Sequence, residues 1–115
     1  GRGRKVEGDL SRGDRVLLIE DLVSTGGSSL AAVKALRQAG ARVADCLATF
    51  AYRPDQAIPK FARARVRLYL LCDAETLLQV GRKQKYIGVR QVIAAQEFLK
   101  TLSYHKQLNS LNSLN

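Results

Sequence analysis

VLLIEDLVSTGGSS, running from Val16 to Ser29, is the stretch that decides the fold of this chain. An apolar run ends on two adjacent carboxylates, Glu20 and Asp21, and passes into a turn of Ser, Thr and Gly residues. The next segment, from Leu30 to Ala39, has apolar residues at helical spacing, and the Gly40 that follows is typical of a helix end. The stretch therefore predicts a strand, a loop and a helix, an arrangement in which α/β proteins bind phosphates.

The rest of the chain repeats this alternation. Two further apolar runs, residues 43–52 and 66–71, have the length of strands, and the first has the continuous apolar character of a strand buried on both faces. Helices are predicted over residues 57–64, 74–80 and 89–102. This order predicts an α/β fold with an open parallel sheet and flanking helices. An open parallel sheet normally has more than three strands, so we expect the amino-terminal part of the fold to be missing.

The two ends of the chain differ from this pattern. Residues 1–15 are rich in Gly and charged residues, with a turn signal at Gly13 and Asp14. The last residues, QLNSLNSLN, repeat a polar triplet that cannot bury enough apolar surface to become ordered. We therefore expect a folded core over residues 1–102 and a disordered tail over residues 103–115.

The charge balance favours an anionic partner. Lys and Arg outnumber Asp and Glu by 19 to 10, for a formal net charge of +9. The basic residues are spread along the chain without an aromatic RNA-binding motif or zinc-finger spacing, which makes a phosphorylated small molecule a better candidate than nucleic acid. The sequence has no run of about 18 apolar residues, so no membrane span is predicted. Cys46 and Cys72 lie in apolar stretches and are expected to be reduced thiols of a cytoplasmic protein.

The loop from Thr25 to Ser29 has the chemistry of a phosphate site. Unpaired N–H groups, hydroxyls and the positive end of a helix dipole suit a phosphate dianion, and glycines let the backbone approach it closely. The loop matches neither the GxxxxGK[ST] nucleotide loop nor the GxGxxG dinucleotide motif. Because Glu20 and Asp21 would repel a phosphate, hydroxyl groups suit them better, and a ribose with a 5-phosphate satisfies both halves. The alternative is an ordinary turn whose acids cap nearby amides.

The stretch resembles the phosphoribosyl pyrophosphate (PRPP) motif of the type I phosphoribosyltransferases, in which apolar residues, two acids and a T-x-G-type phosphate loop follow one another. GRGRKVEGDLSRGDRVLLIEDLVSTGGSSLAAVKALRQAG, with its Val-Glu-Gly lead-in, and the later LYLLCDAETLLQVGRKQKYI are similar to the orotate phosphoribosyltransferases. The resemblance covers residues 1–102 and matches the carboxyl-terminal half of that family. It implies the Rossmann-like fold of type I phosphoribosyltransferases.

The family resemblance implies a Mg2+-dependent glycosyltransferase that joins orotate to PRPP, giving orotidine 5-monophosphate and pyrophosphate in de novo pyrimidine (UMP) biosynthesis. Glu20 and Asp21 would be catalytic, holding the ribose hydroxyls and offsetting charge in the transition state. Ser24 and Arg53 would contact orotate. The residues implied in PRPP binding form one continuous run: Glu20, Asp21, Leu22, Val23, Ser24, Thr25, Gly26, Gly27 and Ser28. Mg2+ would be bound mainly through PRPP, with no direct protein ligand, and the enzyme would be a cytoplasmic homodimer without membrane contact.

The chain also departs from the family pattern. The family's mobile catalytic loop would lie just before Gly1, so Arg2, Arg4 and Lys5 would be its remnant, and the chain alone is expected to lack full activity. Two other functions are compatible with the phosphate motif. One is a non-catalytic PRPP-sensing regulator that binds nucleic acid, and the other is a phosphoribosyltransferase for a different base.

Overall fold

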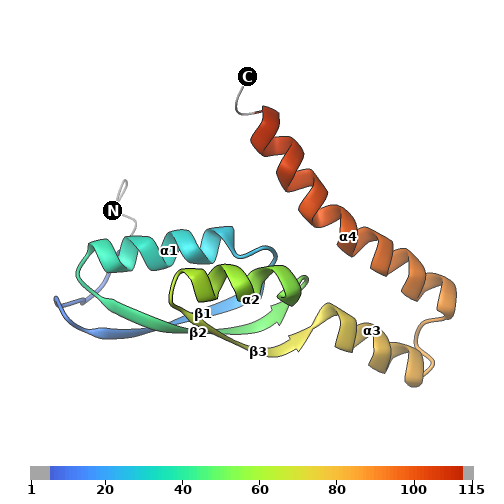
Figure 1. Cartoon of the computed structure of the whole chain (residues 1–115). Helices are drawn as coiled ribbons and strands as arrows, with labels where there is room; N and C mark the ends of the chain where they lie inside the picture. The colour runs from blue at the N-terminus through green and yellow to red at the C-terminus, as the bar shows by residue number, and fades with distance from the viewer. Residues whose placement is uncertain (1–5, 113–115) are drawn as a thin grey trace.

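The computed structural model describes residues 6–112, with side chains through residue 102. Strands and helices alternate in the order β1 (Arg15–Val23), α1 (Gly27–Gln38), β2 (Arg42–Ala51), α2 (Pro54–Arg63), β3 (Arg67–Asp73), α3 (Ala74–Lys83) and α4 (Val89–Asn112) (Figure 1). The predicted α/β architecture is confirmed. None of the helices in the described range combines the length and hydropathy that a bilayer crossing requires.

The three strands form one parallel sheet in the order β1-β2-β3. The pairing of β1 with β2 runs from Arg15 opposite Arg42 to Val23 opposite Ala51, with one irregularity between Val16 and Leu17. Because the strands are parallel and end in register, the segments that follow β1 and β2 leave the sheet at the same edge. This edge is where ligands bind in open α/β sheets.

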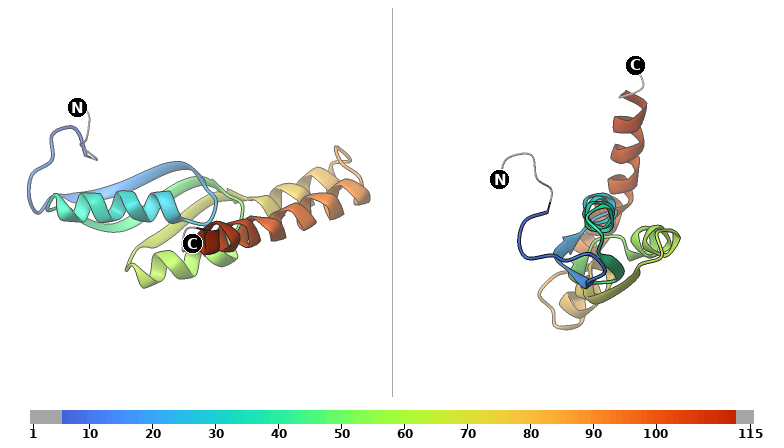
Figure 2. Two further views of the ribbon diagram at one scale, coloured as in Figure 1. Left: turned by 90° about the horizontal axis from the view of Figure 1, so that it is seen from above. Right: turned by 90° about the vertical axis from the view of Figure 1, so that its left-hand side faces the viewer.

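Helices α1 and α2 lie on the same face of the sheet, as Figures 1 and 2 both show. The core lies between these helices and the strands. Its fully buried members include Val33 of α1, Phe61 of α2, and Cys46 and Ala48 of β2. The parallel strands and covering helices are the βαβ crossover units that the sequence alternation predicts.

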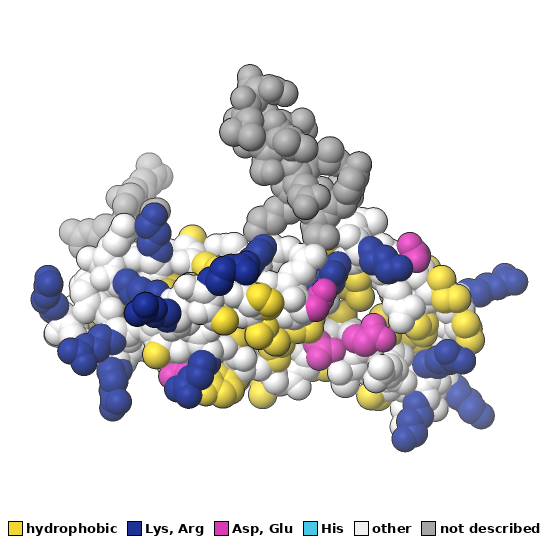
Figure 3. Space-filling view, in the orientation of Figure 1, with side chains coloured by type: hydrophobic (Ala, Val, Ile, Leu, Met, Phe, Trp, Pro, Cys, Tyr) yellow, Lys and Arg dark blue, Asp and Glu magenta, His cyan; other side chains and the backbone are white. Residues whose placement is uncertain are grey.

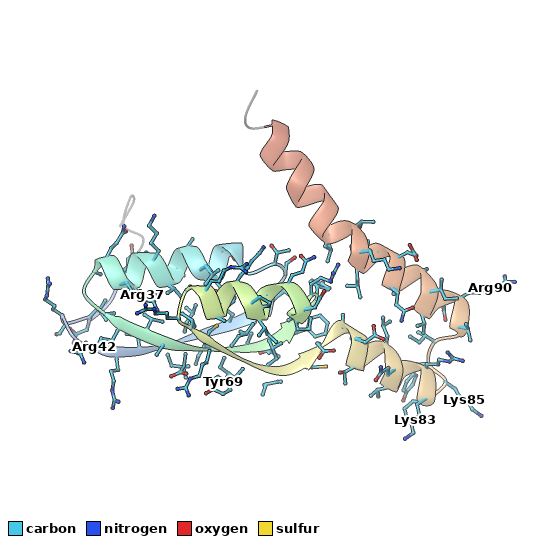
Figure 4. The ribbon with its side chains drawn as sticks, viewed as in Figure 1. Arg37, Arg42, Tyr69, Lys83, Lys85 and Arg90 are labelled. Atoms are coloured by element: carbon cyan, nitrogen blue, oxygen red, sulfur yellow. The ribbon has the colours of Figure 1, made fainter. Side chains whose placement is uncertain are left out.

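The opposite face of the sheet is exposed and apolar. Leu17 and Ile19 of β1 lie on it, as do Tyr69 and Leu71 of β3, and Leu71 is 71% exposed. Figure 4 places Tyr69 on the side of the sheet away from α1 and α2. Parallel sheets are normally covered on both faces. The open face therefore agrees with the expectation that the complete fold has further elements, which stays a prediction.

All four helices begin or end at residues other than those predicted, and α3 ends at Lys83 where the prediction stopped at residue 80. Helix α1 begins at Gly27, before Leu30, because Gly and Ser residues form its first turn without an apolar signal. Helix α2 begins at Pro54 because proline is preorganised for the first helical turn. Helix α4 continues to Asn112, so the backbone of residues 103–112 is helical where we expected disorder. This range contains no Gly or Pro. Once a helix has formed, each further residue that joins it gains one backbone hydrogen bond, so the helix can continue through a polar segment.

The domain boundary at residue 102 stays a prediction, since the side chains beyond it are outside the described range. The same holds for Arg2, Arg4 and Lys5, which precede the first described residue.

The contribution of the core can be tested at Phe61, whose ring is 0% exposed. We expect Phe61→Ala to lower the free energy of unfolding by about 3–5 kcal/mol, because it removes buried surface and leaves a cavity. The matched control is Phe98→Ala, at a ring that is 57% exposed, with an expected change within about 0.5 kcal/mol. Chemical denaturation measures both, and equal losses would contradict the assigned core.

Candidate active site

The candidate site lies at the carboxyl edge of the sheet, where β1 and β2 end beside each other. The Tyr52 amide donates to the Val23 carbonyl at 3.1 Å, which joins the residue after β2 to the end of β1. Ser24 and Arg53 follow these strand ends directly in the two connecting segments. The structure therefore brings the predicted residues of both segments to one edge of the sheet.

The loop between β1 and α1 is very short. Gly26 is the N-cap of α1 and has a left-handed backbone with φ 93° and ψ −1°. The first helical hydrogen bond joins the Leu30 amide to the Gly26 carbonyl at 3.0 Å, and the N-cap residue, a glycine, has no side chain to cap the helix. A hollow of about 280 Å³ lies at this point, lined by residues 23–29. The first-turn N–H groups of α1 are thus available to an anion.

Phe61 of the core lies against the loop at Gly26. A Cβ built on Gly26 would lie 2.9 Å from Cε2 of Phe61, which is closer than ordinary carbon contacts allow. Phe61 is fully buried and so has little freedom to move away. Glycine is therefore required at position 26 both by its backbone angles and by the space above Phe61.

The two acids of β1 have different environments. Glu20 is half-buried, and its Oε1 accepts a hydrogen bond of 3.0 Å from the Ser29 hydroxyl in the first turn of α1. Asp21 is exposed. Of the next two residues, Leu22 is exposed, whereas the Val23 side chain belongs to the core and leaves only main-chain groups for a ligand. The site therefore offers one constrained carboxylate and one that faces solvent.

The sequence placed Ser29 in the phosphate loop, but it did not include Ser29 among the PRPP-binding residues or predict its bond to Glu20. Ser28 and Ser29 are neighbours of the same type, and the predicted PRPP site ended at Ser28. In the structure Ser28 is exposed on the hollow, whereas Ser29 is 0% exposed and bonded to Glu20. Ser28 and Ser29 differ only in the direction in which their side chains leave the helix. A helical projection that starts at Gly27 could therefore have shown that Ser29 lies on the buried side.

Arg53 is held by an ion pair with Asp55 and by a hydrogen bond to helix α4. Its Nε and Nη2 donate to the two carboxylate oxygens of Asp55 at 2.9 and 2.8 Å, and its Nη1 donates to the Leu99 carbonyl of α4 at 2.8 Å. The hydrogen bonds from Arg53 hold the pKa of the Asp55 carboxyl below its usual value. A second hollow of about 420 Å³ lies here, lined by Tyr52, Arg53 and residues of α2, α3 and α4. The orotate contact predicted for Arg53 stays a prediction.

Known proteins similar to this chain include orotate phosphoribosyltransferases and a UMP synthase. Orotate phosphoribosyltransferase of Bacillus cytotoxicus is 39% identical over 100 residues, which are 87% of this chain and 48% of that protein. The structure of Leishmania donovani UMP synthase aligns with a TM-score of 0.72 at 29% identity, over 83% of this chain and 21% of that one. Orotate phosphoribosyltransferase of Aeropyrum pernix aligns at 0.58 and 32% identity, over 64% of this chain and 43% of that one.

The chain belongs to the orotate phosphoribosyltransferase family. It spans about half the length of the curated relatives it matches and corresponds to their carboxyl-terminal portion. No protein-family model matches the chain. This orotate phosphoribosyltransferase homologue has Glu20 and Asp21 in β1 and a short glycine loop after it, and their role in binding PRPP stays a prediction.

The site of this orotate phosphoribosyltransferase homologue has no ready-made metal centre. Within the part of the chain that the structure describes, no three or more His, Cys, Asp or Glu residues form a group that could hold a metal ion. This donor set fits a Mg2+ ion that takes most of its oxygen ligands from phosphates and water. Mg2+ dependence itself stays a prediction.

The requirement for glycine at position 26 can be tested with Gly26→Ala. We expect a loss of about 1–2 kcal/mol in unfolding free energy, because a side chain disfavours the left-handed backbone. We also expect weaker binding of inorganic phosphate, measured by calorimetry. Gly88→Ala is the control, because Gly88 lies far along the chain with no Cβ contact closer than 3.8 Å, and it should leave both quantities unchanged.

The thiol beside the acids provides a further test. Burial, with a smaller contribution from the charge of Glu20, raises the pKa of Cys46 to about 11. At pH 8 Cys46 is therefore protonated, and we expect alkylating reagents to modify the half-buried Cys72 first. Peptide mass spectrometry after brief iodoacetamide treatment identifies the modified residue. Equal labelling of both thiols in the folded protein would contradict the buried position of Cys46.

Proposed function

We propose that this chain supplies the PRPP-binding half of an orotate phosphoribosyltransferase active site. The reaction transfers the phosphoribosyl group of PRPP to orotate, giving orotidine 5-monophosphate and pyrophosphate in pyrimidine biosynthesis. One observation carries the proposal: two acids in the last part of β1 are followed, after a loop of only three residues, by the first turn of α1. This places an anion site and a hydroxyl site within one short segment.

The 5-phosphate of PRPP would bind in the hollow formed by residues 23–29. The N–H groups of Gly27 and Ser28 and the positive end of the α1 dipole attract its negative charge. Thr25 and Ser28 add hydroxyl groups to the same hollow, and the glycine at position 26 lets the backbone approach the ligand closely. Leu22 and Val23 would contribute through the main chain as they lead into the loop.

Glu20 and Asp21 would bind the ribose hydroxyl groups. During transfer a C–N bond forms between C1 of the ribose and a ring nitrogen of orotate, which gives up its proton, while the C1–O bond to pyrophosphate breaks and its electron pair leaves with pyrophosphate. Positive charge develops on the ribose in the transition state of this transfer, and two nearby carboxylates would stabilise that charge. A carboxylate that already lies in place needs no reorganisation during the reaction. The hydrogen bond from Ser29 gives Glu20 this property.

Orotate would lie beside the ribose at the carboxyl edge of the sheet, in contact with Ser24 and Arg53. Support comes from the strand register, since Val23 pairs with Ala51 and both residues leave the sheet at this edge. Arg53 has a planar fork suited to the orotate carboxylate. Using it would require Arg53 to exchange part of its present contact with Asp55 or Leu99.

The cofactor and assembly complete the proposal. Mg2+ would reach the site bound to the pyrophosphate of PRPP, where it neutralises charge on the leaving group. We also propose that the complete enzyme is a cytoplasmic homodimer, and the free thiols Cys46 and Cys72 agree with a reducing compartment. A small-molecule substrate explains the basic charge better than nucleic acid, because Lys and Arg are scattered over the face of the molecule that Figure 3 shows.

Full activity is proposed to need the half of the relatives that this chain does not span. The bare apolar face of the sheet supports this, because a folded domain normally covers such a surface. The assay should therefore use this chain alone and together with the amino-terminal half of the Bacillus cytotoxicus relative. Orotate loss, measured by absorbance with PRPP and Mg2+, is expected only when both halves are present.

The role of Asp21 gives the sharpest test of the proposed reaction. Asp21→Asn keeps the size of the side chain but removes its charge, and we expect orotate turnover in the two-part assay to fall about 100-fold or more. Asp9→Asn is the matched control, at an exposed acid in the lead-in segment, and should leave turnover unchanged. Wild-type turnover in the Asp21 variant would overturn the proposed mechanism.

A further inference from the structure

Ser29 is the one buried polar side chain within the described residues. It is 0% exposed, and its hydroxyl donates to Oε1 of Glu20 at 3.0 Å. The bond spans nine positions of sequence and joins the end of β1 to the first turn of α1. It therefore crosses the loop that forms the proposed phosphate site, and it ties together the two elements on either side of that loop.

This hydrogen bond restricts Glu20 more than its own burial does. A half-buried glutamate side chain has several rotamers, whereas the Ser29 side chain is fully buried on the core side of α1 and has less room to move. The donor therefore selects the Glu20 rotamer that reaches it. One carboxylate oxygen receives the serine hydroxyl, and the second oxygen has no bond to Ser29. A hydrogen bond to a charged acceptor is also stronger than one between neutral groups.

We propose that Ser29 is a positioning residue that orients Glu20 toward the ribose of a phosphorylated sugar. This rests on the proposed function, because it assigns to Ser29 the preparation of the carboxylate that receives the ribose hydroxyls. Ser29 is among the residues that line the hollow, but its side chain is 0% exposed and its hydroxyl is bonded to Glu20, so its role in ligand binding is indirect, whereas Ser28 is exposed. Through the Glu20 hydrogen bond, α1 sets the position of the phosphate site and of the sugar site together.

The consequence is selectivity between two ligands that share a phosphate. Inorganic phosphate needs only the N–H groups and hydroxyls of residues 24–28, whereas ribose 5-phosphate also needs Glu20 in the correct rotamer. Loss of the Ser29 hydroxyl should weaken ribose 5-phosphate binding and leave phosphate binding nearly intact. If Ser29 only stabilised the start of helix α1, loss of its hydroxyl would weaken the binding of both ligands equally.

The test is calorimetric titration of the intact chain with ribose 5-phosphate and with inorganic phosphate. For Ser29→Ala we expect about tenfold weaker binding of ribose 5-phosphate, the effect of one hydrogen bond, and less than about a twofold change for phosphate. Ser29→Thr retains the hydroxyl and should preserve the wild-type ratio of the two affinities. Ser11→Ala is the control, at an exposed serine in the lead-in segment, and should change neither affinity.

A double-mutant cycle identifies the partner through which Ser29 acts. In a Glu20→Ala background, Ser29→Ala should cause no further loss of ribose 5-phosphate affinity, because the oriented group is already absent. Additive losses, an equal loss for both ligands in the single variant, or no loss at all would each overturn the positioning role.

Two further outcomes separate this inference from the proposed function. If the wild-type chain binds ribose 5-phosphate no more tightly than phosphate, the proposed function fails and the inference fails with it. If the wild-type chain prefers the sugar phosphate and Ser29→Ala keeps the full preference, the inference alone fails. Should Ser29→Ala not fold, side-chain NMR of the wild-type protein decides. Ribose 5-phosphate should shift the Glu20 and Ser29 signals together, and a shift of Glu20 alone would overturn the proposal.

Discussion

The connection from β1 to α1 depends on the contact between Gly26 and Phe61. The glycine adopts a left-handed backbone directly over a buried ring, which leaves no room for a side chain. This turn points the first turn of α1 toward the carboxyl edge of the sheet, where β1 has just delivered Glu20 and Asp21. The position of the candidate site is therefore decided by core packing beneath it, and the charged groups follow from that position.

One face of the sheet is covered by helices and the other is exposed, and the candidate site lies on the covered side. Helices α1 and α2 cover the strands on one side and provide the loop, the helix end and the buried Ser29. Leu17, Ile19 and Leu71 remain exposed on the other side. A half-length member of a larger family is expected to have such an unbalanced surface, since the strands of a parallel sheet are apolar on both faces. The local geometry of the candidate site therefore depends on the covered face of the sheet alone.

Much of the fold was predictable because its signals are local. Apolar runs, Gly40 and the alternation of strand with helix are all read over short stretches of chain, and the structure confirms each of them. The helix starts were less accurate, because the first turn of α1 consists of Gly and Ser residues that have no apolar period. The long α4 helix was cut short for a similar reason: a polar composition indicates poor packing, but it does not prevent a backbone from remaining helical.

The sequence by itself determined the order of chemical groups: two acids, a glycine turn with hydroxyls, and a helix whose first N–H groups have no partner. These groups are neighbours along the chain, so their order can be read without the fold. Only the tertiary structure decided what each group can reach. It buried Ser29 against Glu20 while exposing Ser28, and it joined Arg53 to Asp55 and to the Leu99 carbonyl far along the chain. The physical reason is that side-chain direction and long-range hydrogen bonding depend on how helices pack against the sheet, and residue type alone does not specify this.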